Sequence, residues 1–279
     1  MRNHAESEVH LANIQNAKRI VIKVGTSTLT YENGKPNIRS IDHLCRVISD
    51  LCNSGREIVL VTSGALGVGV GKMGLDQRPT DTAGRQAMAA VGQCELMFLY
   101  DKIFAEYGIK TAQVLLTRYD VENEHHRQNV IDCMSALINM SIIPIVNEND
   151  TVAIDELTGS NIGDNDNLSA IVANLVGAQS LVLITDIDGL YNRNPREDDT
   201  AVQIPVVLEI TDALKEMAGG SGSKRGTGGM VTKIQAAEYA CSVGIDTYIV
   251  SSDANNLYAL TDGKVVGTHF VPQNGVGPN

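Results

Sequence analysis

The residues RIVIKV, at positions 19–24, form the first of six short segments rich in Val and Ile. Runs of this length and composition are typical of strands that are buried on both faces. The other five segments occupy residues 57–62, 112–116, 142–146, 180–185 and 247–250. Longer segments with apolar residues three or four positions apart lie between them and predict helices, such as residues 41–51, which are followed by Gly55. This alternation predicts an α/β fold in which an open, mainly parallel sheet is sandwiched between helical layers.

The charge balance argues against nucleic acid and membrane partners. The 279 residues include 22 basic and 33 acidic side chains, and the net charge of −11 opposes polyphosphate backbones and anionic bilayers. No apolar stretch approaches the roughly 20 residues of a membrane span, and residues 1–18 do not resemble a secretory signal. The five cysteines form no CxxC pair, as is typical of buried thiols in a reducing compartment. We therefore expect a cytoplasmic protein that acts on small molecules.

Small and polar residues follow the predicted strands. Ligands of parallel α/β folds bind at the carboxyl ends of the strands, so these positions are candidates for a binding site. They are Gly25-Thr26-Ser27, Ser63-Gly64-Ala65, Asn147-Glu148-Asn149-Asp150 and Thr185-Asp186.

The run GDNDNLS, at residues 163–169, places carboxylates and amides just ahead of an apolar helix. A helix N-terminus offers unpaired N–H donors and a partial positive charge, which favour a small anionic ligand. We expect Asp166 to lie close to that ligand.

The glycine-rich residues 219–229 are compatible with a linker, a disordered loop or a phosphate-binding loop. Because Gly228 and Gly229 lead straight into a segment with helical spacing that contains Lys233, we favour a nucleotide loop. Lys233 has an ordinary alternative as part of a solvated helix face, and Lys23 as an edge-strand lysine that reaches solvent. Two lysines beside glycine turns, in a chain with Asp166 and no GxxxxGK[ST] loop, predict a pair of cations that flank a transferred phosphate.

The glycines at 69, 71 and 74 match GxGxxG, but they lie too far beyond the preceding strand for a dinucleotide fingerprint. We interpret them as a flexible glycine-rich loop that lines a substrate site.

Other polar residues and cysteines carry weaker signals. His125 and His126, beside Glu122 and Glu124, fit a solvated acidic segment better than a metal site. Cys45 and Cys52 are predicted to be core residues. Three arginines are candidates for contact with an anionic ligand, but a single surface arginine seldom has that role. The three are Arg118, Arg127 and Arg196.

Several motifs in order resemble the amino acid kinase family from about residue 18 to residue 267. They are VIKVGTSTL from Val21, VTSGALGVG from Val61, IPIVNENDTV from Ile143, GDNDNLSA from Gly163, LITDIDGLYNRNPR from Leu183 and GTGGMVTKIQAA from Gly226. The NEND and GDNDNLSA segments are similar to the branch that phosphorylates the γ-carboxylate of free L-glutamate with ATP, the first step of proline biosynthesis. The family's stacked open sheet agrees with the alternation of strands and helices.

The resemblance implies a role for each matching residue. Lys23 and Lys233 would contact the ATP phosphates, and Asp166 would hold the two lysines in place. The nucleotide-binding positions would be Lys23, Gly25, Thr185, Asp186, Thr227, Gly228, Gly229, Met230, Val231, Thr232 and Lys233. The substrate-binding positions would be Ser63, Gly64, Asn147, Asp150 and Asn165. Mg²⁺ would be carried mainly by phosphate oxygens, so no protein metal ligand is assigned.

The chemistry agrees with this inventory. A glutamate side chain, with a pKa of about 4.3, is already ionised at neutral pH, so its attack on the γ-phosphoryl group needs no general base. Asp150 would pair with the α-ammonium group, and Asn165 with backbone donors would receive the α-carboxylate. A free amino acid is therefore the predicted substrate.

The resemblance also implies an organisation and partners. Residues 1–17 would be an N-terminal extension, residues 18–267 the kinase domain and residues 268–279 a tail, without the RNA-binding-like (PUA) domain that many members carry. We expect a homo-oligomer (dimer or tetramer), feedback inhibition by proline and functional coupling to a glutamyl phosphate reductase. The alternatives are an aspartate or acetylglutamate kinase, and an amino acid sensor that has lost catalysis.

Overall fold

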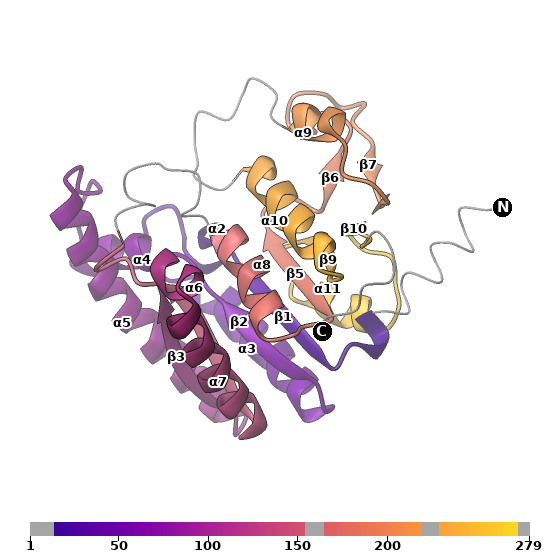
Figure 1. Cartoon of the computed structure of the whole chain (residues 1–279). Helices are drawn as coiled ribbons and strands as arrows, with labels where there is room; N and C mark the ends of the chain where they lie inside the picture. The colour runs from indigo at the N-terminus through magenta and orange to yellow at the C-terminus, as the bar shows by residue number, and fades with distance from the viewer. Residues whose placement is uncertain (1–13, 154–164, 219–228, 273–279) are drawn as a thin grey trace. The chain divides into compact units, whose positions relative to one another are not determined.

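The computed structural model describes residues 14–153, 165–218 and 229–272 (Figure 1). The chain folds into two compact units, one of which is continuous, Lys23–Asn165, and the other built from the residues on either side of it. The first strand, β1 (Arg19–Val24), begins in the second of these units and ends in the first. The peptide bond between Asn165 and Asp166 is the other crossing point.

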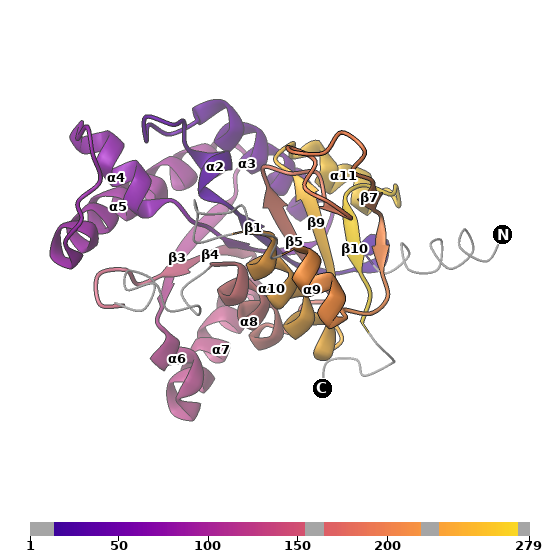
Figure 2. The same ribbon diagram turned by 90° about the horizontal axis from the view of Figure 1, so that it is seen from above.

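The continuous unit contains three parallel strands in the order β3-β4-β2. Its strands are β2 (Glu57–Val61), β3 (Lys110–Leu116) and β4 (Ile142–Glu148), with Leu60 paired to Ile145 and Val114 to Val146. Its helices are α2 (Thr26–Leu29), α3 (Ile38–Asn53), α4 (Ala65–Met73), α5 (Thr82–Glu106), α6 (Arg118–Glu122) and α7 (Glu124–Asn139). Figure 2 shows α3 and α7 on opposite sides of these strands.

The helix predicted around residues 41–51 is confirmed as α3. Its apolar positions, spaced by three and four, are buried on one face: Ile41, Leu44, Val47, Ile48 and Leu51. Asn37 caps its start by accepting a hydrogen bond from the Ser40 amide. The chain leaves the helix through Gly55, whose φ of +97° suits a residue without a Cβ atom.

The glycine-rich residues 69–74 were predicted as a flexible loop, and this prediction is wrong. Gly69 and Gly71 lie inside α4, and Gly74 caps its end with a φ of +66°. A Cβ atom on Gly69 would lie 1.8 Å from the carbonyl oxygen of Met88 in α5, and one on Gly92 would lie 1.8 Å from the carbonyl oxygen of Ala65. The glycines therefore permit two helix backbones to approach closely.

The discontinuous unit contains the strand order β5-β9-β10-β8. β5 (Ser180–Thr185) and β9 (Asp246–Ser251) are parallel, whereas β10 (Thr268–Phe270) runs antiparallel to β9 and parallel to β8 (Val206–Val207). β6 (Leu190–Tyr191) and β7 (Gln203–Ile204) form a separate antiparallel pair. The helices are α8 (Asn165–Leu175), α9 (Asp212–Ala218), α10 (Met230–Ser242) and α11 (Asn255–Thr261), with α10 and α11 on opposite sides of the strands (Figure 2).

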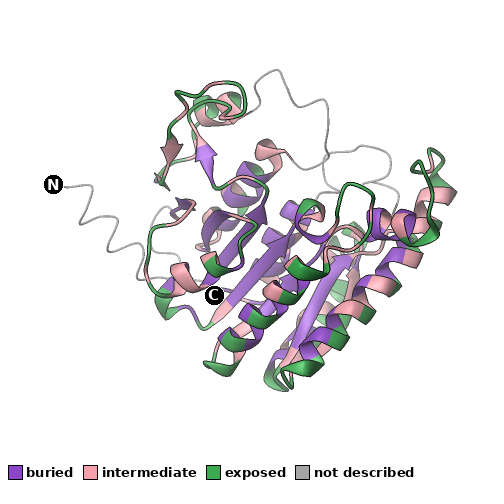
Figure 3. Ribbon diagram, turned by 180° about the vertical axis from the view of Figure 1, so that it is seen from behind, coloured by how far each residue is buried: buried purple, intermediate pink, exposed green. Residues whose placement is uncertain are grey.

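Burial follows the strands in each unit (Figure 3). All six residues of β5 are buried, as are the five residues from Ile20 to the end of β1. The expected open, mainly parallel sheet with flanking helices is confirmed. Among the described residues, β2–β4, β3–β4, β5–β9 and β8–β10 pair in parallel, whereas β9–β10 and β6–β7 are antiparallel. Among the described residues, no helix combines the length and hydropathy that crossing a bilayer requires.

Candidate active site

Asp166 and Lys233 form a buried ion pair in the discontinuous unit. Asp166 lies in the first turn of α8, and Lys233 lies in the first turn of α10. Nζ of Lys233 is 3.1 Å from Oδ2 of Asp166, and the side chains are 6% and 0% exposed. Because burying a lone charge is costly, Lys233 is buried together with a partner of opposite charge. The alternative interpretation of Lys233 as part of a solvated helix face is wrong.

Thr232 adds a polar contact to the same carboxylate. Its Oγ1 atom lies 2.9 Å from Oδ2 of Asp166 and 2.8 Å from the carbonyl oxygen of Gly229. Gly229 is the extended residue that precedes α10, so a glycine leads directly into this helix as predicted. The N–H groups of Met230 and Val231 in the first turn can serve an anion. Thr227 and Gly228 lie outside the described residues.

Thr185 is the last residue of β5, and Asp186 follows it directly. Oδ2 of Asp186 accepts a hydrogen bond of 2.7 Å from the Arg196 guanidinium, and Oδ1 lies 3.2 Å from Oγ1 of Thr185. Partial burial alone would raise the pKa of Asp186, but the bonds from Arg196 and Thr185 outweigh it and lower the pKa. Asp186 is therefore a carboxylate at neutral pH, and Arg196 is fixed beside it.

Lys23 and Gly25 mark the end of β1. Lys23 is 5% exposed, so the alternative of an edge-strand lysine that reaches solvent is wrong. Gly25 has an extended backbone and is the N-cap residue of α2, which begins at Thr26.

Asn165 is the centre of a polar network in the continuous unit. Its Nδ2 atom lies 2.7 Å from the carbonyl oxygen of Thr62, 3.0 Å from Oγ of Ser63 and 2.9 Å from Oδ1 of Asn147. Asn165 and Asn147 are 6% and 2% exposed. The sequence expectation that this amide donates to an α-carboxylate does not fit, because its two hydrogens already serve three protein acceptors.

Gln93 extends this network and was not found from the sequence. It is buried in α5, and its Oε1 atom accepts a 2.8 Å hydrogen bond from Nδ2 of Asn147. Thr62 is also held from α5, since its Oγ1 lies 2.8 Å from the Tyr100 hydroxyl. Polar residues within a long, mostly apolar helix were the available signal, but a linear sequence does not show that they face β4.

Gly64 and Asp150 occupy the turns beside the network. Gly64 has a φ of +92° and precedes the first residue of α4, a conformation in which a side chain would be strained. Asp150 is half-buried two residues beyond the end of β4. Five of the predicted site residues lie in the continuous unit together with Lys23 and Gly25, and we call these five the acceptor set: Ser63, Gly64, Asn147, Asp150 and Asn165. Asp166, Thr185, Asp186 and residues 229–233 lie in the discontinuous unit.

The profile of the amino acid kinase family matches residues 18–251. The chain belongs to the amino acid kinase family. Among curated relatives of this amino acid kinase, the glutamate 5-kinase of Clostridium perfringens is 52% identical over 94% of this chain and 98% of its own length. The glutamate 5-kinase of Moorella thermoacetica is 48% identical over 96% of this chain and 70% of its own length.

Solved structures share the fold of this amino acid kinase at low identity. The isopentenyl phosphate kinase of T. acidophilum has a TM-score of 0.59 and 14% identity over 90% of this chain and 99% of its own. The UMP kinase of Bacillus anthracis has a TM-score of 0.60 and 12% identity over 92% of this chain and 97% of its own. These likenesses confirm the predicted amino acid kinase fold.

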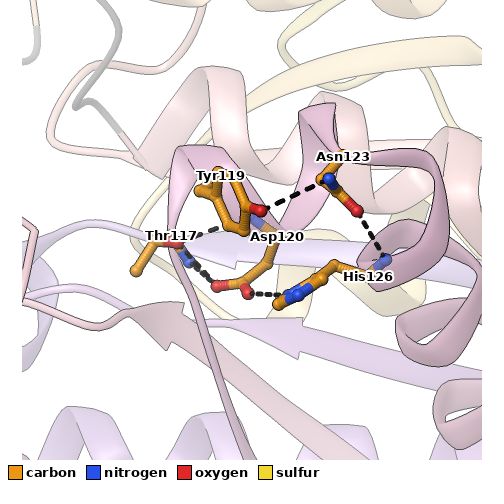
Figure 4. Close-up of polar contacts among 5 residues, drawn as sticks. All are labelled: Thr117, Tyr119, Asp120, Asn123 and His126. Atoms are coloured by element: carbon orange, nitrogen blue, oxygen red, sulfur yellow. Dashed lines mark hydrogen bonds and ion pairs between the residues drawn. The ribbon is translucent and has the colours of Figure 1, made fainter.

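His126 of this amino acid kinase lies at the corner between α6 and α7 (Figure 4). Oδ2 of Asp120 accepts bonds from the backbone and hydroxyl of Thr117 at 2.8 and 2.6 Å, and Oδ1 lies 3.1 Å from Nδ1 of His126. Asn123 accepts from the His126 amide and caps α7. In the part of the chain that the structure describes, no group of three or more His, Cys, Asp or Glu side chains could hold a metal ion.

Proposed function

We propose that this chain transfers the γ-phosphoryl group of ATP to the γ-carboxylate of L-glutamate and forms L-glutamyl 5-phosphate, the first step of proline biosynthesis. The observation that carries this proposal is the buried Lys233–Asp166 pair in the first turns of two helices. The identity of 52% with the Clostridium perfringens glutamate 5-kinase, over nearly the full length of both chains, supports the choice of glutamate.

Lys233 supplies positive charge to the transferred phosphoryl group. Phosphoryl transfer places charge on the equatorial oxygens, and a fixed cation in a dry site stabilises it without reorganisation. Asp166 is a positioning residue that orients Lys233 and balances its charge. Lys23 is the second cation of the proposal, and its place near the carboxyl end of β1, where ligands of parallel sheets bind, supports this role.

The remaining nucleotide positions bind by backbone and polar contacts. The residues that open α10 direct N–H groups at phosphate, from Gly229 to Thr232. Thr185 ends β5, Asp186 follows it, and Gly25 follows β1, at the carboxyl ends of strands where ligands of parallel sheets bind. We propose the same role for Thr227 and Gly228.

The acceptor set binds the amino acid. Asp150 pairs with the α-ammonium group, and Ser63, Gly64, Asn147 and Asn165 supply or support polar contacts. Catalysis needs no general base, because a glutamate carboxylate is ionised at neutral pH, so positioning and charge neutralisation carry the reaction.

Mg²⁺ is part of the proposal as a companion of ATP. Mg²⁺ commonly keeps several waters and binds through substrate phosphates. Asp166 and Asp186 are already engaged by Lys233 and by Arg196, so we assign no protein ligand. When bound, the ion neutralises phosphate charge.

We also propose the setting of the reaction. The enzyme acts in the cytoplasm as a dimer or tetramer, is inhibited by proline at or beside the glutamate site, and passes its product to a glutamyl phosphate reductase. An acyl phosphate hydrolyses readily, which supports a close functional link to the enzyme that consumes it. Proline that leaves glutamate saturation unchanged would contradict the inhibition.

Acyl phosphate formation, trapped with hydroxylamine, tests the proposal. Glutamate, aspartate and N-acetylglutamate are compared in parallel with ATP and Mg²⁺. Product with glutamate alone is expected. Product with aspartate or N-acetylglutamate in its place would overturn the substrate, and glutamate binding without product would identify an amino acid sensor.

A further inference from the structure

The amide groups of the acceptor set have a fixed polarity. The carbonyl oxygen of Thr62 can only accept, so the Asn165 atom 2.7 Å away must be Nδ2. The backbone N–H of Glu148 can only donate, so the Asn147 atom 2.9 Å away must be Oδ1. The contact of 2.9 Å between Asn165 and Asn147 joins these same two atoms as donor and acceptor. Two main-chain groups therefore decide the orientation of both side chains.

Gln93 in α5 is the third side-chain amide in this chain of hydrogen bonds, after Asn165 and Asn147. Because Oδ1 of Asn147 faces Glu148, its Nδ2 faces α5, where it needs an acceptor. Oε1 of Gln93 provides that acceptor at 2.8 Å. A residue without an acceptor at position 93 would leave the buried Nδ2 group of Asn147 unsatisfied. Asn147 would then be free to reorient, and Asn165 would lose a fixed hydrogen-bond acceptor.

The network leaves an unused acceptor on Asn165. Its Oδ1 atom is buried and has no hydrogen-bond partner in the part of the chain that the structure describes. The Asn165 residue is 6% exposed, so water satisfies this oxygen poorly. Buried acceptors without a partner are costly and rare, so we expect this oxygen to accept a hydrogen bond from a bound ligand.

We propose that Gln93 is a specificity-determining positioning residue, which acts through Asn147 to make Asn165 present its carbonyl oxygen to the α-ammonium group of the substrate. This inference deepens the proposed function and rests on it. It assigns to Gln93 a role in choosing amino acids over acids that lack the amino group. Glutarate, which is glutamate without its α-amino group, leaves the Asn165 oxygen unpaired and is rejected for that reason.

The test compares glutamate with glutarate in wild-type enzyme and in Gln93→Met, which keeps the size of the side chain and removes the acceptor. We expect kcat/KM for glutamate to fall roughly tenfold, mainly through a higher KM, while kcat/KM for glutarate stays unchanged. The KM for ATP is also expected to stay unchanged. The ratio of the two kcat/KM values is the readout that a merely structural role would not move.

Two further variants sharpen the comparison. Gln86→Met makes the same chemical change two turns earlier on α5, outside the network, and is expected to keep the wild-type ratio. Gln93→Glu keeps an acceptor oxygen for Asn147 and is expected to preserve more of the ratio than Gln93→Met. If Gln93→Met does not fold, a Gln93→Glu enzyme that loses the ratio overturns the inference.

The outcomes separate this inference from the proposed function. Wild-type enzyme that phosphorylates neither acid refutes the proposed function. Wild-type enzyme that prefers glutamate, together with a Gln93→Met enzyme that keeps the same preference or loses activity equally on both acids, refutes the role of Gln93 alone.

Discussion

Nζ of Lys233 lies 3.1 Å from Oδ2 of Asp166, and neither side chain has appreciable contact with solvent. In Lys233→Met the carboxylate keeps the Thr232 hydroxyl but loses this cation. We expect turnover to be abolished and the free energy of unfolding to fall by about 2 kcal/mol, because a charge-assisted hydrogen bond to a buried group is lost. Acyl phosphate assays and urea denaturation measure the two effects.

Lys264→Met is the matched control for this prediction. Lys264 is a surface lysine with a side chain 70% exposed, 3.7 Å from Asp262. Its replacement is expected to change neither turnover nor stability measurably, because exposed ion pairs contribute little. A Lys233→Met enzyme that turns over like the Lys264→Met enzyme would remove Lys233 from the proposed mechanism.

Gly69→Ala is expected to destabilise the continuous unit by about 3 kcal/mol, because its Cβ atom would lie 1.8 Å from the main-chain oxygen of Met88. Gly67→Ala is the control, since its Cβ atom would meet only side-chain atoms of Thr26 and Arg78, at 3.7 and 3.8 Å. Both glycines lie in α4, so the second change is expected to be neutral or to stabilise by about 0.5 kcal/mol. Equal midpoints in urea for the two variants would contradict the close approach of α4 and α5.

Asp120→Asn tests the corner between α6 and α7. Partial burial would raise the pKa of Asp120, but the bonds from Thr117 and His126 together lower it. A lowered pKa means that the carboxylate stabilises the fold above its ordinary pKa of about 4, and that this contribution disappears as the pH falls through the lowered value. The variant is expected to be about 1 kcal/mol less stable than wild type at pH 7.

This difference should shrink as the pH falls from about 4 through the lowered pKa of Asp120, where the wild-type side chain also becomes neutral. Thermal unfolding of both proteins between pH 7 and pH 3 measures it. A stability difference that stays constant over this range would show that the charge on Asp120 has no part in holding the corner.

The cysteines are expected to react in two groups with an aromatic disulfide reagent at pH 8. Cys94 and Cys133 are exposed and should react quickly. Burial raises the pKa of Cys52 and of Cys241 to about 12, and it raises that of Cys45 further, so these thiols should react only after unfolding. The double variant Cys94→Ser, Cys133→Ser should lose the fast phase, and a fast phase that persists would mean that Cys45, Cys52 or Cys241 is accessible in the folded protein.

The sequence was sufficient for the principal strands because each is a continuous apolar run. All six predicted strands are present, and the ends differ little: β3 begins at Lys110 and β4 continues to Glu148. The strands β6, β7, β8 and β10 were not predicted, because segments of two or three residues show no periodicity. The glycines of α4 were predicted wrongly as a loop because two closely packed helices require glycine at their contact, and a glycine-rich segment is also typical of a loop.

The candidate site was predictable where a charged residue stands at a position that the sequence marks as a helix start. Asp166 and Lys233 were singled out by a carboxylate and a lysine at helix starts, and the structure pairs them. Gln93 was missed because its importance depends on a hydrogen bond to Asn147, 54 positions away. Amide polarity is likewise decided by neighbouring main-chain groups, which a sequence does not place in space.

The peptide bond between Asn165 and Asp166 joins two residues whose side chains belong to different hydrogen-bond networks. Asn165 bonds to Thr62, Ser63 and Asn147, whereas Asp166, its immediate successor, bonds to Lys233. A recombination event with a break at this bond would exchange Asn165 together with its partners and would leave the Asp166–Lys233 pair whole. The first turn of α8 is thus a boundary at which the proposed acceptor set can vary independently of the Asp166–Lys233 pair, whereas Lys23 would be exchanged together with that set.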